Sequence, residues 1–371
     1  MSLALSMQHL LPTVWPAAAL QAVPVSSAMP HAQRLLLAPM EGLLDWRMRD
    51  VLTRVGGIDR AVCEFIRVTD QLLPPRLFYR VMPELLNASR TAAGVPVRAQ
   101  LLGSDPACLA DNAAQLAALG AEGIDLNFGC PAKTVNRHRG GAVLLDEPEL
   151  LHDIVAAVRR AVPASLPVSA KMRLGNRCDS NMIEAAQAIA DGGACELVVH
   201  GRTKLQGYKP PAFWDRIGLI RQAVALPVIA NGELWTVGDA QRCRAESGCD
   251  TLMLGRGMVA NPGLAWALRS PEAPGLSWAQ MQPLLAYYFG LLPLGSGQLM
   301  APRHRAGRLK QWLALLREHF DEARSLFAEL RTVDDPELLA LRLGLVEPQG
   351  LADGPCQPAP SGVDTASALA V

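Results

Sequence analysis

Residues 95–129 read VPVRAQLLGSDPACLADNAAQLAALGAEGIDLNFG, and this stretch has the pattern of one strand–helix–strand unit. Its two apolar runs, 95–103 and 123–129, have the length of β-strands. Between them, residues 106–121 begin at a proline, carry apolar side chains at helical spacing and close near Gly120. Strands that read as near-continuous apolar runs are covered on both faces, as in a parallel sheet. The unit therefore predicts parallel strands joined by a covering helix.

The same alternation continues on both sides of this unit. Eight apolar runs occupy residues 34–40, 60–66, 95–103, 123–129, 167–175, 196–202, 227–233 and 250–256. Segments with helical periodicity separate them. Eight such runs in about 240 residues match a closed (β/α)8 TIM barrel better than an open doubly wound sheet. We predict an α/β barrel of this kind for residues 34–270.

The sequence changes character after the predicted barrel. Three amphipathic segments, at 276–292, 301–320 and 321–331, predict a smaller all-helical domain over residues 271–346. Residues 1–33 are apolar, but no Lys or Arg precedes the apolar stretch and prolines interrupt it, which is unlike a signal peptide. We interpret 1–33 as a disordered or mis-started extension, with Met29 as an alternative initiator, and 347–371 as a disordered tail.

Composition limits the partners and the compartment. The 35 basic and 35 acidic residues give a formal net charge of zero, so any nucleic acid must be held by a local basic patch. The eight cysteines form no CxxC pair and no metal-ligand spacing with histidine, so we expect neither a metal nor a disulfide framework. No apolar run reaches the roughly 18 residues of a membrane span, and a reduced cytoplasm is the simplest setting. The sequence does not fix the oligomeric state, and a monomer is the expectation.

Each apolar run ends in polar or glycine-bearing residues. In a TIM barrel the carboxyl ends of the strands build the active site. We therefore expect these ends to converge on one mouth, formed by Pro39, Met40, Glu41, Glu64, Gln100, Asn127, Lys171, Arg173, His200, Gly201, Arg202, Asn231, Gly232, Glu233, Gly255 and Arg256.

The last two strand ends favour a phosphate-bearing cofactor. The loops at 231–233 and 255–257 contain glycines, so backbone N–H groups can approach a phosphate there, and Arg256 can add a bidentate charge. One such loop alone is explained equally well as a plain strand-to-helix turn. The two together favour a cofactor phosphate.

A flavin mononucleotide (FMN) needs more than its phosphate. Its ring requires hydrogen-bond partners at the polar edge and a nearby cation that stabilises the reduced anion. Gln100 and Lys171 suit those two tasks, and Pro39 and Met40 can form an apolar shelf. The alternative for Lys171 is a structural ion pair.

Cys130 stands in the loop after the fourth run, between a glycine and a proline. A loop thiol beside Lys133 and Arg137 can give up a proton near neutral pH and act as a general acid. A nucleophile or an inert buried thiol are the alternatives. The remaining cysteines in apolar or helical surroundings fit the inert class: Cys63, Cys108, Cys195, Cys243 and Cys249.

Several ordered motifs resemble one flavoenzyme family. They are PMEG (39–42), RAQLLG (98–103), DLNFGCPAKTVNRHRGGAVLL (125–145), KMRLG (171–175), VVHGRTKLQGY (198–208), PVIANGE (227–233) and GRG (255–257). Together they resemble the dihydrouridine synthases, which reduce uridine in tRNA, over about residues 34–335. The stretches 64–74, 200–208 and 308–331 are most similar to the bacterial branch named DusC, whose target is uridine 16 of the D-loop.

The resemblance implies a mechanism and a set of site residues. NADPH reduces FMN, the flavin gives a hydride to carbon 6 of uracil, and a cysteine acid, matching Cys130, protonates carbon 5. Arg67, Asn127 and Tyr208 match positions that face the tRNA or its target base. The FMN contacts of the family fall on Pro39, Met40, Glu41, Gln100, Lys171, His200, Asn231, Gly232, Glu233, Gly255 and Arg256. One departure is the basic stretch 137–139, where the family usually has glycines.

Binding of tRNA also requires phosphate contacts. Residues 301–311 carry four cations and no acid: Arg303, Arg305, Arg308 and Lys310. A solvated helix face is the alternative explanation of this basic run. A stacked uracil must be turned out of the RNA to reach a flavin in a barrel mouth, and Arg173, Arg202 and Tyr208 are the expected contacts of the flipped nucleotide.

Two rival functions remain open on sequence alone. An FMN barrel of the dihydroorotate dehydrogenase or old-yellow-enzyme type, acting on a small free metabolite, would share the phosphate loops but would not need the basic helical domain. A non-catalytic tRNA-binding protein would not need Gln100, Lys171 and Cys130 gathered at strand ends.

Overall fold

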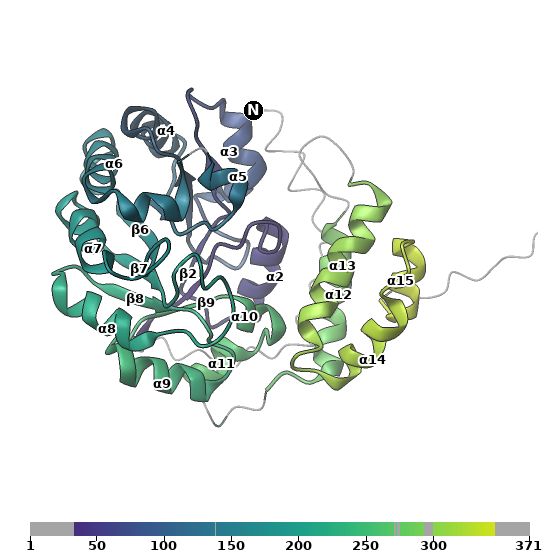
Figure 1. Ribbon diagram of the computed structural model, residues 1–371. Coiled ribbons are helices and arrows are strands. Elements are labelled where there is room, and N and C mark those ends of the chain that lie inside the picture. The colour runs from purple at the N-terminus through teal and green to yellow at the C-terminus, as the bar shows by residue number, and fades with distance from the viewer. Residues whose placement is uncertain (1–32, 138, 271, 273–274, 293–299, 346–371) are drawn as a thin grey trace, which may run out of the picture.

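The computed structural model describes residues 33–345 except 138, 271, 273–274 and 293–299 (Figure 1). The predicted extension at 1–33 therefore lies outside the described residues except for residue 33, and so do its alternative initiator Met29 and the predicted tail. In the described part, no helix is both long and apolar enough to cross a lipid bilayer.

Eight parallel strands close into a barrel, which confirms the predicted fold class. The strands are β1 (Leu35–Leu37), β2 (Arg60–Val62), β4 (Val97–Leu102), β5 (Ile124–Phe128), β6 (Val168–Arg173), β7 (Leu197–His200), β8 (Val228–Asn231) and β9 (Leu252–Leu254). Each lies within one of the eight predicted runs. Closure comes from β1, which pairs with both β2 and β9, and from the pairing of β2 with β4. A short extra strand, β3 (Ile66–Arg67), pairs with the end of β4.

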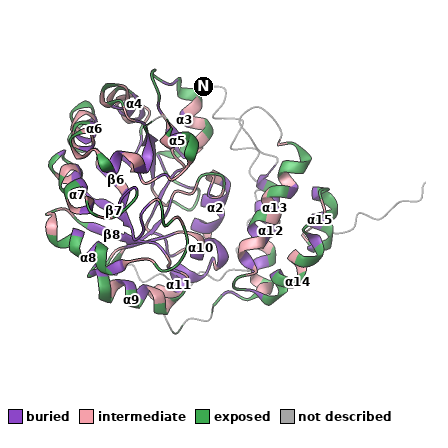
Figure 2. Ribbon diagram, in the orientation of Figure 1, coloured by how far each residue is buried: buried purple, intermediate pink, exposed green. Residues whose placement is uncertain are grey.

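Helices between successive strands, and two more after β9, surround the barrel, and their inward faces are buried (Figures 1 and 2). They are α2 (Trp46–Val55), α3 (Pro75–Val81), α4 (Pro106–Ala118), α5 (Lys133–Asn136), α6 (Pro148–Ala161), α7 (Met182–Asp191), α8 (Trp214–Ala223), α9 (Val237–Ser247), α10 (Arg256–Ala260) and α11 (Leu264–Arg269), with 3-10 turns η2 (Pro83–Asn87) and η3 (Gly141–Asp146). Helix α4 begins as predicted, because the Asp105 side chain accepts the backbone N–H of Cys108 at 2.7 Å and Pro106 follows it.

A buried ion cluster closes the amino end of the barrel, opposite the strand ends expected to form the site. Glu196, just before β7, pairs with Arg60 on β2 and with Arg98 on β4, the latter at 2.7 Å. Burial would raise the pKa of Glu196, but the surrounding guanidinium groups hold it below its ordinary value. The charged cluster therefore links three strands across the floor of the barrel.

The chain after the barrel is helical, as predicted. Helices α12 (Trp278–Leu291), α13 (Pro302–Leu316) and α14 (Asp321–Leu330) lie within the three expected segments, and α15 (Pro336–Arg342) is an addition. The helices lie beside the barrel next to α2 and α10 (Figure 1). The buried indole of Trp312 on α13 donates to the carbonyl of Val259 on α10 at 3.0 Å. The proposed boundary between the two domains, at residue 271, stays a prediction.

Candidate active site

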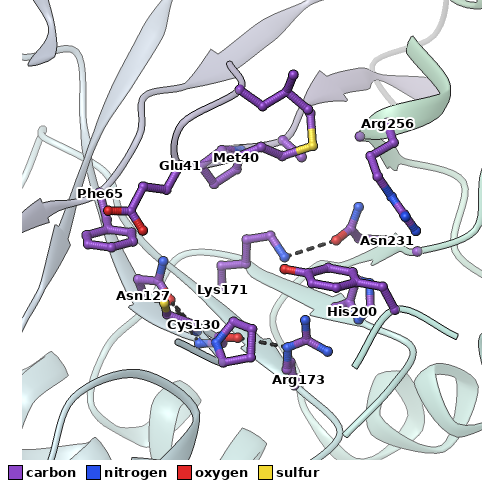
Figure 3. Close-up of a pocket in the computed structure, with 18 of the residues that line it drawn as sticks. Met40, Glu41, Phe65, Asn127, Cys130, Lys171, Arg173, His200, Asn231 and Arg256 are labelled. Atoms are coloured by element: carbon purple, nitrogen blue, oxygen red, sulfur yellow. Dashed lines mark hydrogen bonds between the residues drawn. The ribbon is translucent and has the colours of Figure 1, made fainter. Parts of the chain in front are cut away.

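A cavity of about 430 Å³ opens at the carboxyl ends of the barrel strands, a volume within the roughly 300–1,000 Å³ common for cofactor sites. Figure 3 shows Asn127 and Cys130 on one side of it, Asn231 and Arg256 on the other, and Lys171 between them. Most of the predicted site residues line it: Pro39, Met40, Glu41, Gln100, Asn127, Cys130, Lys171, Arg173, His200, Tyr208, Asn231, Gly232, Glu233, Gly255 and Arg256. Their individual roles stay predictions.

Several expected residues do not line the cavity. These are Glu64, Arg67, Gly201 and Arg202. Arg303, Arg305, Arg308 and Lys310, which were expected to contact tRNA phosphates from the helical domain, also lie outside it. Conversely, the predicted site omitted seven apolar lining residues: the small Ala38, Pro131 and Ala132, and four large ones, Leu43, Phe65, Leu234 and Trp235. Each of the four follows a barrel strand within a few residues, so their position relative to the strand ends was the signal that could have found them.

Cys130 is presented by a tight turn at the end of β5. The Asn127 side-chain oxygen accepts the backbone N–H groups of Gly129 at 3.0 Å and Cys130 at 2.9 Å. Asn136 on α5 donates to the Cys130 carbonyl at 3.0 Å, which fixes the far side of the turn. The thiol is buried, with 8% of the residue exposed, and lies at the cavity wall. Asn127, expected to face the nucleotide, thus also shapes the turn that carries the thiol.

Burial raises the pKa of the Cys130 thiol, and Glu41 adds to the effect, whereas Arg173 and Arg67 oppose it. The expectation that Lys133 and Arg137 would ease the loss of its proton is wrong. Both side chains are exposed, and burial outweighs the nearby positive charge. The thiol is therefore protonated at neutral pH, as a proton donor must be and a thiolate nucleophile is not.

A buried polar chain supports this turn from inside the barrel. Gln100 accepts from the Asn127 amide at 2.8 Å and donates to Asp125 at 2.7 Å, and Ser169 donates to the same carboxyl group. Gln100 is fully buried. Its amide keeps one N–H and one lone pair for other partners, so an added contact at the edge of a flavin remains chemically open.

Arg173 connects two loops of the mouth. Its guanidinium donates to the carbonyl of Gly129 at 2.8 Å, next to Cys130, and to the carbonyls of Thr203 at 3.2 Å and Gly207 at 3.0 Å in the loop after β7. It also lies 5.0 Å from the ring centre of Tyr208. The side chain is buried. Arg173, predicted as a nucleotide contact, therefore holds together the loops that frame the nucleotide's expected position.

Lys171 on β6 places a cation in the floor of the cavity. Its ammonium donates to the side-chain oxygen of Asn231 at 3.0 Å, and Asn231 donates to the Met253 carbonyl at 2.7 Å. Burial, together with the charge of Arg173, lowers the pKa of Lys171 to about 7. Among the described residues no carboxylate pairs with Lys171, so the structural ion pair considered as an alternative is not formed. A bound anion would restore its charge.

The opposite wall carries an imidazole, that of His200, and a guanidinium, that of Arg256. Burial lowers the pKa of His200 far below its ordinary value, and Lys171, Arg173 and Arg256 lower it further, so the imidazole is neutral. Within the described part of the chain, its Nδ1 has no hydrogen-bond partner. Arg256 lies 5.2 Å from the ring centres of both Tyr208 and Trp235 and forms no ion pair with a described residue.

Arg202 requires a correction. It was expected to steady a flipped nucleotide, but it is fully buried, pairs with Glu233 and donates to the Pro211 carbonyl at 3.0 Å. Glu233 has a φ of 56°, and the preceding Gly232 has a φ of 112°, where a Cβ would lie 3.3 Å from the His200 ring. Arg202 thus fixes the strained loop after β8 from behind the cavity and does not face it.

The basic run on α13 also differs from the expected open cationic face. Three of its four cations have largely covered side chains and pair with acids: Arg305 with Glu337 at 3.0 Å, Arg308 with Asp45 at 3.1 Å, and Lys310 with Asp334 at 2.8 Å. Arg303 is exposed and has no partner among the described residues. The other explanation of this basic run, a solvent-exposed helix face, therefore applies to Arg303 alone among the four.

Comparison with known proteins places this geometry in a family. The chain is 55% identical over 316 residues to the tRNA-dihydrouridine(16) synthase of Aquipseudomonas alcaligenes, covering 84% of this chain and 99% of that protein. It is 55% identical to the Pseudomonas putida protein of the same name, covering 84% and 97%. The Escherichia coli K12 protein of that name is 48% identical over 315 residues, covering 85% and 98%. The dihydrouridine synthase family model matches residues 36–281, so the chain belongs to the dihydrouridine synthase family.

Proposed function

We propose that this protein reduces a uridine of tRNA, at position 16 of the D-loop, to 5,6-dihydrouridine. The observation that carries the proposal is a buried, protonated thiol at the wall of a cation-lined cavity, in a barrel that belongs to the dihydrouridine synthase family. The choice of position 16 follows the names of the 48–55% identical relatives. A small free metabolite as substrate, or a binding role without chemistry, finds no comparable support.

The cavity fits FMN chemically. Lys171 lies in its floor without a carboxylate partner, the Nδ1 of His200 lacks a described partner, and Arg256 is unpaired at the wall. A phosphate and a ring that becomes anionic on reduction would suit the positively charged groups, Lys171 and Arg256. Gly255 and Gly257 both line the cavity, and a Cβ at Gly257 would lie 2.0 Å from the Leu234 carbonyl oxygen, so only a bare backbone fits there.

The reaction adds a hydride to carbon 6 and a proton to carbon 5 of uracil. Reduced flavin, when bound, supplies the hydride, and NADPH is the reductant we propose. Cys130 donates the proton from its Sγ, and its raised pKa keeps that proton in place until the acceptor carbon develops charge. Arg173 lies close enough to stabilise the thiolate left behind. Solvent then returns a proton to Cys130.

The target uridine must leave the RNA stack to reach the cavity. Tyr208 is 53% exposed at the rim, and the guanidinium groups of Arg173 and Arg256 lie 5.0 and 5.2 Å from its ring centre, which leaves part of the ring open to solvent. A ring held in this way can stack on an extruded base without being displaced by it. Because the substrate is tRNA, we propose the cytoplasm as the place of action.

Two measurements test the proposal directly. The purified protein should be yellow and should release FMN on denaturation, and it should use NADPH to form dihydrouridine in tRNA transcribed in vitro. In cells that lack the protein, mapping of tRNA should show uridine in place of dihydrouridine at position 16. A colourless, full-length protein that cannot be loaded with FMN, or an unchanged position 16, would refute the proposal.

A further inference from the structure

The loop between β1 and α2, residues 38–45, forms part of the cavity wall. Ala38, Pro39, Met40, Glu41 and Leu43 all line the cavity. The loop is compact, because the backbone N–H groups of residues 43 and 44 both donate to the Met40 carbonyl, at 3.1 and 2.9 Å. Its position therefore decides where the predicted apolar shelf of the flavin lies.

One side chain from the helical region holds this loop. Arg308 on α13 donates to the carbonyl of Gly42 and, at 3.0 Å, to that of Leu43. It also pairs at 3.1 Å with Asp45, the residue that caps α2 by accepting the Met48 N–H. One guanidinium thus contacts three of the four residues between Glu41 and Trp46, across about 265 positions of sequence.

Two neighbours complete the attachment at Gly42. Gln311, one turn further along α13, donates to the Gly42 carbonyl at 3.0 Å and accepts from Arg308 at 2.8 Å. On the other side, the Glu64 carboxylate, which follows β2, accepts the Gly42 N–H. Gly42 has a φ of 72°, a backbone conformation that other residues rarely adopt, and both its N–H and its carbonyl are hydrogen-bonded. The loop is held between the barrel and α13.

We propose that Arg308 is a positioning residue for the cofactor site, which clamps the 38–45 loop in its cofactor-binding position from the helical region. The proposal rests on the proposed function only in taking FMN as the occupant of the cavity. It replaces the RNA contact that the sequence suggested for Arg308, because its two terminal nitrogens already contact the loop carbonyls, Gln311 and Asp45, and its Nε is buried. A loop fixed before binding lowers the ordering cost of the cofactor.

The test measures the binding of FMN to the cofactor-free protein through the quenching of flavin fluorescence. Arg308→Ala should raise the FMN dissociation constant about tenfold relative to wild type, which corresponds to about 1.4 kcal/mol. Amide hydrogen exchange at residues 42–44 of the cofactor-free variant should also become faster. The affinity for tRNA, measured with the flavin-saturated protein, should stay within about twofold, because the guanidinium does not face the RNA.

Arg305→Ala is the matched control. Arg305 lies on the same helix with a similarly covered side chain, but it pairs with Glu337 on α15 and lies 4.9 Å from the ring centre of Phe289, so it does not reach the loop. This variant should leave FMN affinity and exchange at residues 42–44 unchanged. If both variants lose FMN equally, the effect comes from the stability of the helical region and the clamp is refuted.

The remaining outcomes are also decisive. If wild type binds FMN and Arg308→Ala binds it as tightly, the clamp fails while the proposed function stands. If wild type binds no FMN, both fail. Should Arg308→Ala not fold, Gln311→Ala decides the matter, because Gln311 is exposed and its substitution removes one donor to Gly42 and one acceptor of Arg308. It should weaken FMN binding about threefold, and an unchanged affinity would refute the clamp.

Discussion

Cys130 is the residue on which the proposed chemistry depends most. Cys130→Ala should keep FMN and tRNA affinity but lower the rate of dihydrouridine formation by about 10²- to 10⁴-fold, the usual contribution of a positioned acid. Single-turnover oxidation of the reduced flavin by tRNA is the measurement that isolates this step. Cys178→Ala is the control, because Cys178 is an exposed thiol that does not line the cavity. A fully active Cys130→Ala would remove the acid role.

Lys171 gives a prediction about pH. Its pKa is lowered to about 7 in the folded protein, so between about pH 7 and its ordinary value near 10.4 the unfolded chain binds a proton that the folded chain lacks. Stability from this group therefore rises with pH over that window. Thermal melts of cofactor-free wild type and Lys171→Met should show a melting-temperature difference that moves in favour of wild type from pH 7 to pH 9. Parallel curves would mean that the ammonium is not desolvated.

At the residue scale, sequence reasoning found which side chains gather at the strand ends but not which way each points. The spacing of polar groups after strands indicated Gln100 and Lys171, because strand ends in a barrel share one face. It could not show that Arg202 turns behind the cavity toward Glu233 or that Arg308 reaches back to residue 42. Those contacts join positions far apart in the chain, and a single sequence carries no record of such pairs.

Among the elements, α5 directly follows the loop that carries the thiol, and exposed positive charge lies at its end. Arg137 directly follows this helix, is exposed and has no ion-pair partner in the described part of the chain. If the mouth receives tRNA, Arg137→Gln should weaken tRNA binding and reduce the slope of log affinity against log salt by about 0.7 to 0.9, the value of one phosphate contact. Filter binding at four salt concentrations would measure it.

Arg160 provides the control for that experiment. It is an exposed arginine at the end of α6, which leads into the amino end of β6 and so lies at the opposite end of the barrel. Arg160→Gln should leave both affinity and slope unchanged. Equal effects of the two substitutions would show that tRNA senses only overall charge and would refute a contact at α5.

The elements themselves were largely predictable, for physical reasons. The eight strands are buried on both faces, so each needs an apolar run, and the runs are visible in the sequence. The two-residue strand β3 was missed because so short a pairing has no periodicity of its own. Helix α15 was missed although Asp335 followed by Pro336 is a start signal: the Asp335 side chain accepts the N–H groups of Glu337 and Leu338 at 2.8 and 3.0 Å.

On the scale of the whole molecule, barrel and helices share a buried contact surface. Trp312 is fully buried, donates to Val259 and packs at 5.0 Å, edge to face, on Tyr288. Trp312→Ala should lower stability by about 3–5 kcal/mol, the usual cost of removing a buried aromatic side chain. Chemical denaturation would measure it, with Leu338→Ala on the exposed face of α15 as the control that stays within about 0.5 kcal/mol. Equal small effects would show that the two parts are stabilised separately.

The attachment of the 38–45 loop to α13 affects how a truncated version of the protein would behave. The family match stops at residue 281. A protein truncated there would retain Cys130, Lys171 and both glycine-bearing loops. It would lack Arg308, which donates to the Gly42 carbonyl. If the truncated protein is purified without colour, the cause is then the loss of Arg308, and the result does not show that the full-length protein lacks a flavin. Inhibitor screens against this protein should accordingly use a polypeptide that includes α13.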